Sequence, residues 1–266
     1  MIPLTLAAQD SLTMLGREIK HTLRYPMMLI ASILTPVVML LLFVYVLGGP
    51  IGDGLGAAAR GAPYVDFLAP GILMMTVAAA SSTTAINVCT DMTGGIIDRF
   101  RTMAVSRGAV LTGHVGTYVV RTLVNTAFVT GVAVLAGFRP RASVAGWFAV
   151  IGIVAAFAFA LAWLSAALGL VTKSIAGANS STLPILFLLP FLSSAFVPAA
   201  SMPAGLRWFS AHQPFTPVVD SLRALLAGAP AGDTAYVALA WCAGIALAGY
   251  LWARAAFGRG ARASAR

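Results

Sequence analysis

The side chains of this chain that could do chemistry are few, and several of them lie in one segment, GGIIDRFRTMAVSRG (94–108). The segment contains Asp98, Arg99, Arg101 and Arg107, although only 9% of the chain is charged. A carboxylate and three guanidinium groups at this spacing can pair on one helix surface or with a partner protein. For Asp98 and Arg101, both a surface pair and a docking contact are open interpretations.

The apolar side chains of this segment share one arc of a helix at about 100° per residue. That arc consists of Ile96, Ile97, Phe100, Met103 and Ala104. The polar side chains fill the opposite arc, and Gly94 and Gly95 allow the chain to turn before the helix begins. The pattern predicts a short helix that buries one face and presents a charged face to a soluble partner.

Groups that would make the chain an enzyme are not assembled in the sequence. The three histidines, His21, His114 and His212, lie in different segments, and neither HExxH nor G-x-S-x-G occurs. The stretch that ends at Lys173 and Ser174 has the last two residues of a phosphate-binding loop, but the glycines that would cradle a phosphate are missing. We therefore expect no catalytic residue, no metal site and no cofactor bound by this chain. Energy for any transport would come from outside it.

The composition is that of an integral membrane protein. Of the 266 residues, 59% are hydrophobic, and the mean hydropathy is +0.91. The 17 basic residues exceed the 8 acidic ones, but they lie at the ends of apolar runs rather than on one surface. This distribution is typical of residues that flank membrane spans, and it argues against nucleic-acid binding.

Six apolar windows are long enough to cross a bilayer as helices. They cover residues 27–47, 66–88, 115–137, 146–171, 180–198 and 235–257. More Lys and Arg residues fall on the side of the two termini, which predicts that both termini are cytoplasmic. Residues 10–24 have an amphipathic pattern that predicts an interfacial helix. The expected fold is an all-α integral membrane protein with one domain over 1–266: a cytoplasmic N-terminal part (1–26), a six-span bundle (27–257) and a basic tail (258–266).

Polar and proline residues in and between the spans are candidates for a gate or a substrate path. Arg121 and Asn125 share a face of the third span, where bundle packing and substrate contact are both open. Pro184, Pro190 and Pro198 either bend the fifth span or form a gate or re-entrant element. Pro203, Pro214 and Pro217 then break an outer segment, in which Asp220 and Arg223 lie one turn apart. That pair either stabilises a short helix or contacts substrate.

Two stretches resemble the type-2 ABC exporter permeases, especially the daunorubicin-resistance-like branch. They are DMTGGIIDRFRTMAVSRGAVL (91–111) and LPILFLLPFLSSAFVPAASMPAGLRWFSAHQPFTPVVDSLRALLAG (183–228). The second stretch contains the F-V-P element of Phe196 to Pro198, followed in order by M-P, Q-P-x-T-P and D-x-x-R. With the six-span layout, the resemblance covers nearly the whole chain. Ala104 departs from the family pattern, which usually has Pro there, so the bend after Met103 is open.

The resemblance implies a transmembrane permease subunit that pairs with a separate ATP-binding subunit, in two copies per complex, which would hold ATP and Mg. The coupling element would comprise Gly94, Asp98, Arg99, Phe100, Arg101 and Arg107. The resemblance also implies a homo- or heterodimer of permease halves among membrane lipids. It further implies outward transport of an amphipathic drug, antibiotic, lipid or glycolipid. The wealth of Arg, Ala and Gly suggests a bacterial plasma membrane. The alternative is a membrane-embedded lipid-processing enzyme or assembly factor.

Overall fold

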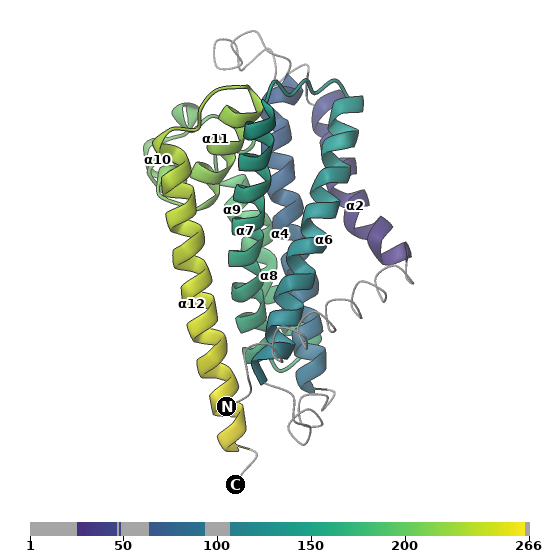
Figure 1. Ribbon diagram of the computed structural model, residues 1–266, viewed down its shortest axis with the longest axis vertical. Coiled ribbons are helices and arrows are strands. Elements are labelled where there is room, and N and C mark those ends of the chain that lie inside the picture. Colours follow the sequence, from purple (N-terminus) through teal and green to yellow (C-terminus); the bar gives the residue numbers. More distant parts are fainter. Residues whose placement is uncertain (1–25, 47, 49–63, 94–106, 264–266) are drawn as a thin grey trace.

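The computed structural model describes residues 26–46, 48, 64–93 and 107–263, which form an all-helical bundle (Figure 1). Four helices are long and apolar enough to cross a membrane. They are α4 (Tyr64–Thr93), α6 (Arg107–Leu135), α7 (Val144–Val171) and α12 (Asp233–Ala263). The second, third, fourth and sixth predicted spans are thus confirmed as helices.

The first and fifth predicted spans correspond to shorter apolar helices. The first consists of α2 (Pro26–Leu41) and a π-helical turn, η1 (Leu42–Val46). The fifth consists of α8 (Ile175–Leu183), a second π-helical turn, η3 (Pro184–Leu188), and α9 (Leu189–Phe191). Each is interrupted near a proline, Pro36 or Pro184, as expected because proline removes a backbone donor. Six crossings therefore stay a prediction, whereas the apolar helical character of both segments is confirmed.

Several helices extend beyond the windows that hydropathy predicted. Helix α4 continues to Thr93, and α6 begins at Arg107 rather than at residue 115. Arg107, which we predicted to close the coupling segment, is therefore the first residue of a long helix. The remaining predicted coupling residues lie outside the described residues, as does the predicted interfacial helix at 10–24.

Helix α4 is the central helix of the bundle. In its apolar window, 67% is buried, against 17% for the peripheral helix α12 (Figure 1). Helix α12 packs mainly along α7, where Gly249 permits close approach: a Cβ there would lie 2.7 Å from the backbone N of Leu164. Phe157 of α7 and Phe215 meet edge to face, with ring centroids 4.9 Å apart, in the buried core.

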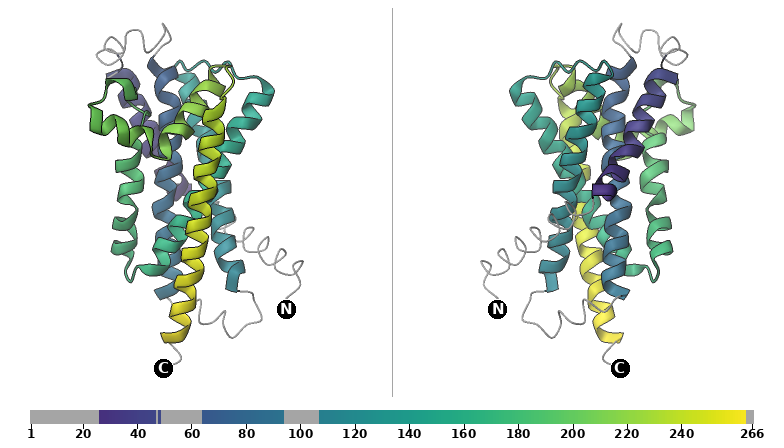
Figure 2. Two further views of the ribbon diagram at one scale, coloured as in Figure 1. Left: turned by 90° about the vertical axis from the view of Figure 1, so that its left-hand side faces the viewer. Right: turned by 90° about the vertical axis from the view of Figure 1, so that its right-hand side faces the viewer.

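The chain between the fifth apolar helix and α12 folds into short helices at the upper end of the bundle (Figures 1 and 2). These are a 3₁₀ turn, η4 (Ala199–Ser201), followed by α10 (Ala204–Ala211) and α11 (Phe215–Leu226). Pro198, Pro203 and Pro214 each directly precede one of them, where proline's missing N–H costs no helical hydrogen bond. In the described structure, this segment consists of short helices, and its re-entrant character stays a prediction.

Candidate functional site

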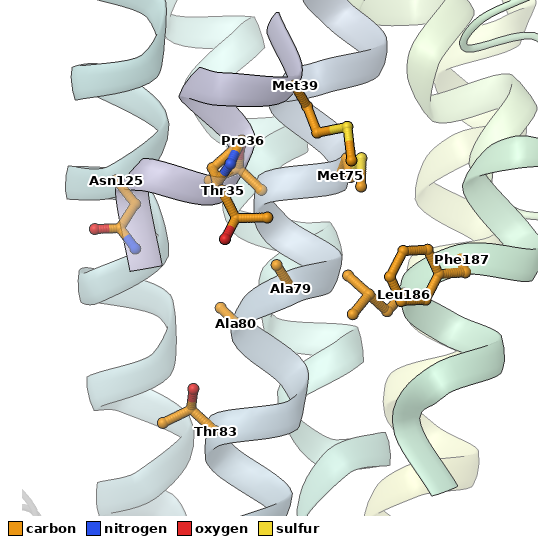
Figure 3. A pocket seen from close by; sticks show the side chains of 11 residues that line it. Thr35, Pro36, Met39, Met75, Ala79, Ala80, Thr83, Asn125, Leu186 and Phe187 are labelled. Carbon is orange, nitrogen blue, oxygen red and sulfur yellow. The ribbon is translucent and has the colours of Figure 1, made fainter. Parts of the chain in front are cut away.

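A cavity of about 250 Å³ lies among four elements of the bundle: α2, α4, α6 and η3. Its lining is mainly apolar, with a few hydroxyl groups and one amide. The lining residues are Thr35, Pro36, Met39, Met75, Thr76, Ala79, Ala80, Thr83, Asn125, Leu186 and Phe187. Figure 3 shows Asn125 on one side and Leu186 and Phe187 on the other. The cavity residues of α4 lie in the middle of this 30-residue helix, so the cavity is at mid-depth of the bundle.

The cavity has the chemistry of a site for part of an amphipathic molecule. Apolar walls with a small number of polar groups are typical of small-molecule pockets, which usually measure about 300–1,000 Å³. The smaller volume here suits a ring system or a chain segment rather than a whole drug-sized molecule. Asn125 is buried in the described structure, and it is the predicted path residue that reaches this cavity.

Helix α6 carries a row of polar residues that leads from its lower end to this cavity. His114, Tyr118, Arg121 and Asn125 are spaced by four, three and four positions, which places them on one face. His114 Nε2 lies 2.8 Å from Asp91 Oδ2 in the last turn of α4. The Tyr118 hydroxyl donates a 2.6 Å hydrogen bond to the carbonyl oxygen of Val77. The row thus joins α6 to α4 at two levels.

The Asp91–His114 pair was not predicted. The two residues are 23 positions apart, and hydropathy placed both in a loop. Helical continuation of α4 and α6 brings them together on antiparallel helices directly flanking residues 94–106. The signal in the sequence was the absence of a proline in 88–115, which allows both helices to continue. The pair holds together the two helix ends from which the predicted coupling segment departs.

A second polar cluster, at the upper end, is centred on Arg223 of α11. Its guanidinium bonds to Asp220 Oδ1 at 2.7 Å and donates to the carbonyl oxygen of Ser194 at 2.9 Å and to that of Phe67 at 3.3 Å. It also lies 4.1 Å from the centroid of the Phe67 ring. Burial lowers the pKa of the Arg223 guanidinium, and the Asp220 carboxylate opposes that shift. The pair does more than stabilise its own helix, because Arg223 connects α11 to α4 and to the turn after α9.

The turn at residues 192–198 is held by further contacts with its surroundings. The Ser194 hydroxyl donates to Asp220 Oδ1 at 2.8 Å. The Phe196 ring stacks on Phe191 and on Phe43 of η1, with centroids 4.7 and 5.1 Å apart. Gly71 of α4 approaches the turn so closely that a Cβ would lie 2.7 Å from the carbonyl oxygen of Ala195. We predicted a fifth span reaching residue 198, but its helix ends at Phe191 because these contacts fix a turn instead.

The other predicted site residues lie apart from the cavity. Pro190 is buried in α9, and Pro198 precedes η4. Pro203 is exposed before α10, and Pro214 is half-buried before α11. Phe67 and Ser194, which are partners of Arg223, were not predicted, because nothing in their local sequence marks a long-range contact.

These features define a multi-pass membrane protein with an apolar cavity at mid-depth and a polar cluster, centred on Arg223, at one end. Residues 9–227 match the ABC-2 type transporter family, so the chain belongs to that family and is a membrane subunit of an ABC transporter. It is 28% identical over 222 residues to the daunorubicin resistance ABC transporter permease protein DrrB1 of Streptomyces coeruleorubidus, covering 84% of this chain and 76% of that protein.

The chain is also similar to the probable doxorubicin resistance ABC transporter permease protein DrrC of Mycobacterium tuberculosis. The two are 26% identical over 178 residues, which is 67% of this chain and 64% of that protein. The chain therefore matches less than two thirds of the length of the mycobacterial relative. Membership of the family implies an ATP-binding subunit as a partner.

Proposed function

We propose that this chain is the transmembrane half of an ATP-driven exporter that moves an amphipathic substrate outward across a bacterial plasma membrane. The observation that carries the proposal is the mid-depth cavity between α2, α4, α6 and η3, in a chain that matches the family over 9–227. The named relatives are resistance permeases for the amphipathic drugs daunorubicin and doxorubicin. Drug, antibiotic, lipid and glycolipid substrates each contain an apolar part that can occupy an apolar cavity with a few polar groups.

In this proposal the chain forms one permease domain with six membrane crossings and both termini in the cytoplasm. Helix α4 then ends on the cytoplasmic side, α6 begins there, and α10 and α11 lie on the outer side. Two permease halves, identical or not, pair with two ATP-binding subunits that hold ATP and Mg. Each ATP-binding subunit docks on residues 94–107, next to the Asp91–His114 pair. In this arrangement, the charged side chains of the segment at 94–108 contact the ATP-binding subunit.

The proposal is tested by transport into inside-out vesicles that contain the chain and its ATP-binding subunit. Daunorubicin, as the probe, should accumulate only when ATP is hydrolysed. Replacing Ala80 by Phe should place a phenyl ring in the cavity of about 250 Å³ and reduce uptake by about tenfold, because the ring narrows the space left for the substrate. The matched control is Ala127→Phe, on the exposed face of α6, which should transport normally.

Two outcomes would contradict the proposal. Normal uptake by the Ala80→Phe complex would show that the cavity is not on the substrate path. ATP binding or hydrolysis by the chain without its partner would contradict the division of labour between the subunits.

A further inference from the structure

Arg121 is a charged residue in the middle of an apolar helix. It lies ten positions into the candidate span Leu111–Leu135, about 15 Å along the helix from Leu111. Charged side chains at this depth are costly and usually functional, and they normally face a partner of opposite charge. Within the described part of the chain, no ion pair and no hydrogen bond joins Arg121 to another residue.

Two hydrogen-bond donors one turn apart on α6 lack an acceptor. The Nε atom of Arg121 and the hydroxyl of Thr117 are both buried and have no partner among the described residues. Residues at i and i+4 are neighbours on a helix surface, so the two groups can serve one acceptor. Buried donors without a partner require an explanation, and an absent ligand is one.

The acids of the described helices are placed too far away to pair with Arg121. Asp66 and Asp233 lie in the first turns of α4 and α12, and Asp91 lies in the last turn of α4, where it contacts His114. Asp220 contacts Arg223 at the upper end. A second copy of the same helices would therefore also present no carboxylate at this depth. The missing negative charge is better supplied by a ligand.

The surroundings of Arg121 indicate what kind of anion this is. On one side, Val120, Val124 and Phe128 form an exposed apolar stripe, with 37%, 57% and 56% of their surfaces accessible. On the other side, Asn125, one turn along, reaches the cavity. A molecule with an apolar chain and a charged head could lie with its chain against the stripe and its head at Arg121. Guanidinium groups bind phosphate and carboxylate with paired hydrogen bonds.

We propose that Arg121, with Thr117, binds the anionic head group of an amphiphile as that head group crosses the bilayer core. The head group is a phosphate or carboxylate attached to an apolar chain, such as that of an acidic lipid. The guanidinium replaces part of the hydration that the anion loses on leaving water. The inference rests on the proposed transport function, and it adds a charge preference that the apolar cavity alone does not supply.

The test measures lipid binding to the purified full chain in detergent by native mass spectrometry. The probes are phosphatidylglycerol and phosphatidylcholine with identical acyl chains. The wild-type chain should bind phosphatidylglycerol about tenfold better, since a charge-assisted hydrogen bond contributes at least that factor. The Arg121→Gln variant should lose the preference, and Arg121→Lys should retain part of it. The control Arg254→Gln, at an exposed position of α12, should behave as wild type.

Three results would overturn the inference. They are an equal affinity of the wild-type chain for both lipids, an unchanged preference in a folded Arg121→Gln variant, and displacement of bound phosphatidylglycerol by millimolar inorganic phosphate, which would indicate a site for a soluble anion. Should Arg121→Gln not fold, the wild-type preference and the reduced preference of Arg121→Lys decide the question. Daunorubicin uptake in phosphatidylcholine vesicles tests the transport function separately, so a failure of the inference can be distinguished from a failure of the proposed function.

Discussion

Removing the Arg223 side chain should destabilise the upper end of the bundle more than removing any exposed arginine. In the Arg223→Ala variant, the carbonyl oxygens of Ser194 and Phe67 lose their donor, and Asp220 loses its counter-ion. The cation–π contact with the Phe67 ring, at 4.1 Å, is lost as well. Apart from the pair with Asp220, which lies on α11 itself, these contacts connect α11 to α4 and to the turn at residues 192–198, so the substitution removes links between parts that are distant in sequence.

The stability that the Arg223→Ala variant should lose can be estimated from the exposure of each partner of Arg223. The Asp220 side chain is 41% accessible, so solvent screening limits the ion pair to less than about 1 kcal/mol. The hydrogen bond to Ser194, from a charged and largely buried donor, is worth about 2 kcal/mol. The longer bonds to Phe67 and its ring contact add about 1 kcal/mol. The total loss is about 3–4 kcal/mol, which corresponds to a fall in Tm of about 6–16 °C for a domain of this size.

The assay is thermal unfolding of the purified chain in detergent, followed by tryptophan fluorescence. Arg207→Ala is the matched control, because Arg207 also donates to two carbonyl oxygens, those of Ala200 and Met202, but is exposed on α10. Its Tm should fall by no more than about 3 °C. Equal shifts for the two variants, or a shift below 3 °C for Arg223→Ala, would refute this account of the cluster.

Three further substitutions test other parts of the molecule. Arg101→Glu should leave expression and membrane insertion intact but reduce co-purification of the ATP-binding subunit and coupled ATPase activity together; unchanged association would show that the charged segment is not the docking site. Gly71→Ala should cost about 1–3 kcal/mol, because its Cβ would meet the Ala195 carbonyl, and an unchanged Tm would contradict that close approach. His114→Ala should lower the Tm by about 2–4 °C, whereas His114→Gln, which can still donate to Asp91, should restore most of it; equal losses would exclude the hydrogen bond as the cause.

Hydropathy predicted the helical class and the long helices, because a bilayer requires about 20 apolar residues with internally satisfied backbone groups. Hydropathy placed the helix ends poorly, because a helix can extend beyond its apolar window and the window does not show where the helix stops. Helix α6, for example, begins at Arg107 and not at residue 115. Hydropathy also overextended the fifth span to residue 198. There the residues are apolar, but the contacts of Ser194 and Phe196 fix a turn.

The candidate site was predicted in part. Asn125, Asp220 and Arg223 were identified from their polarity within apolar surroundings, and the structure places Asn125 at the cavity. The remaining lining residues, such as Met75, Ala79 and Leu186, are ordinary apolar residues whose meeting depends on how α4 and η3 pack. The partners of Arg223 are mostly backbone carbonyls, and no sequence pattern encodes which carbonyl a distant arginine reaches.

Helix α4 contributes residues to the cavity, to the Asp91–His114 pair and to the cluster around Arg223. The length of this helix has a mechanical consequence. Its 30 residues form a rod of about 45 Å, with Phe67 near one end, the cavity residues at the middle and Asp91 near the other end. A rod that pivots at its centre moves its two ends in opposite directions, so a tilt of about 5° displaces each end by about 2 Å. Such a displacement exceeds the tolerance of a hydrogen bond. With α11 held in place, a pull at the Asp91 end would thus lengthen the contacts of Phe67 with Arg223, while the cavity at the centre of the helix would stay almost stationary.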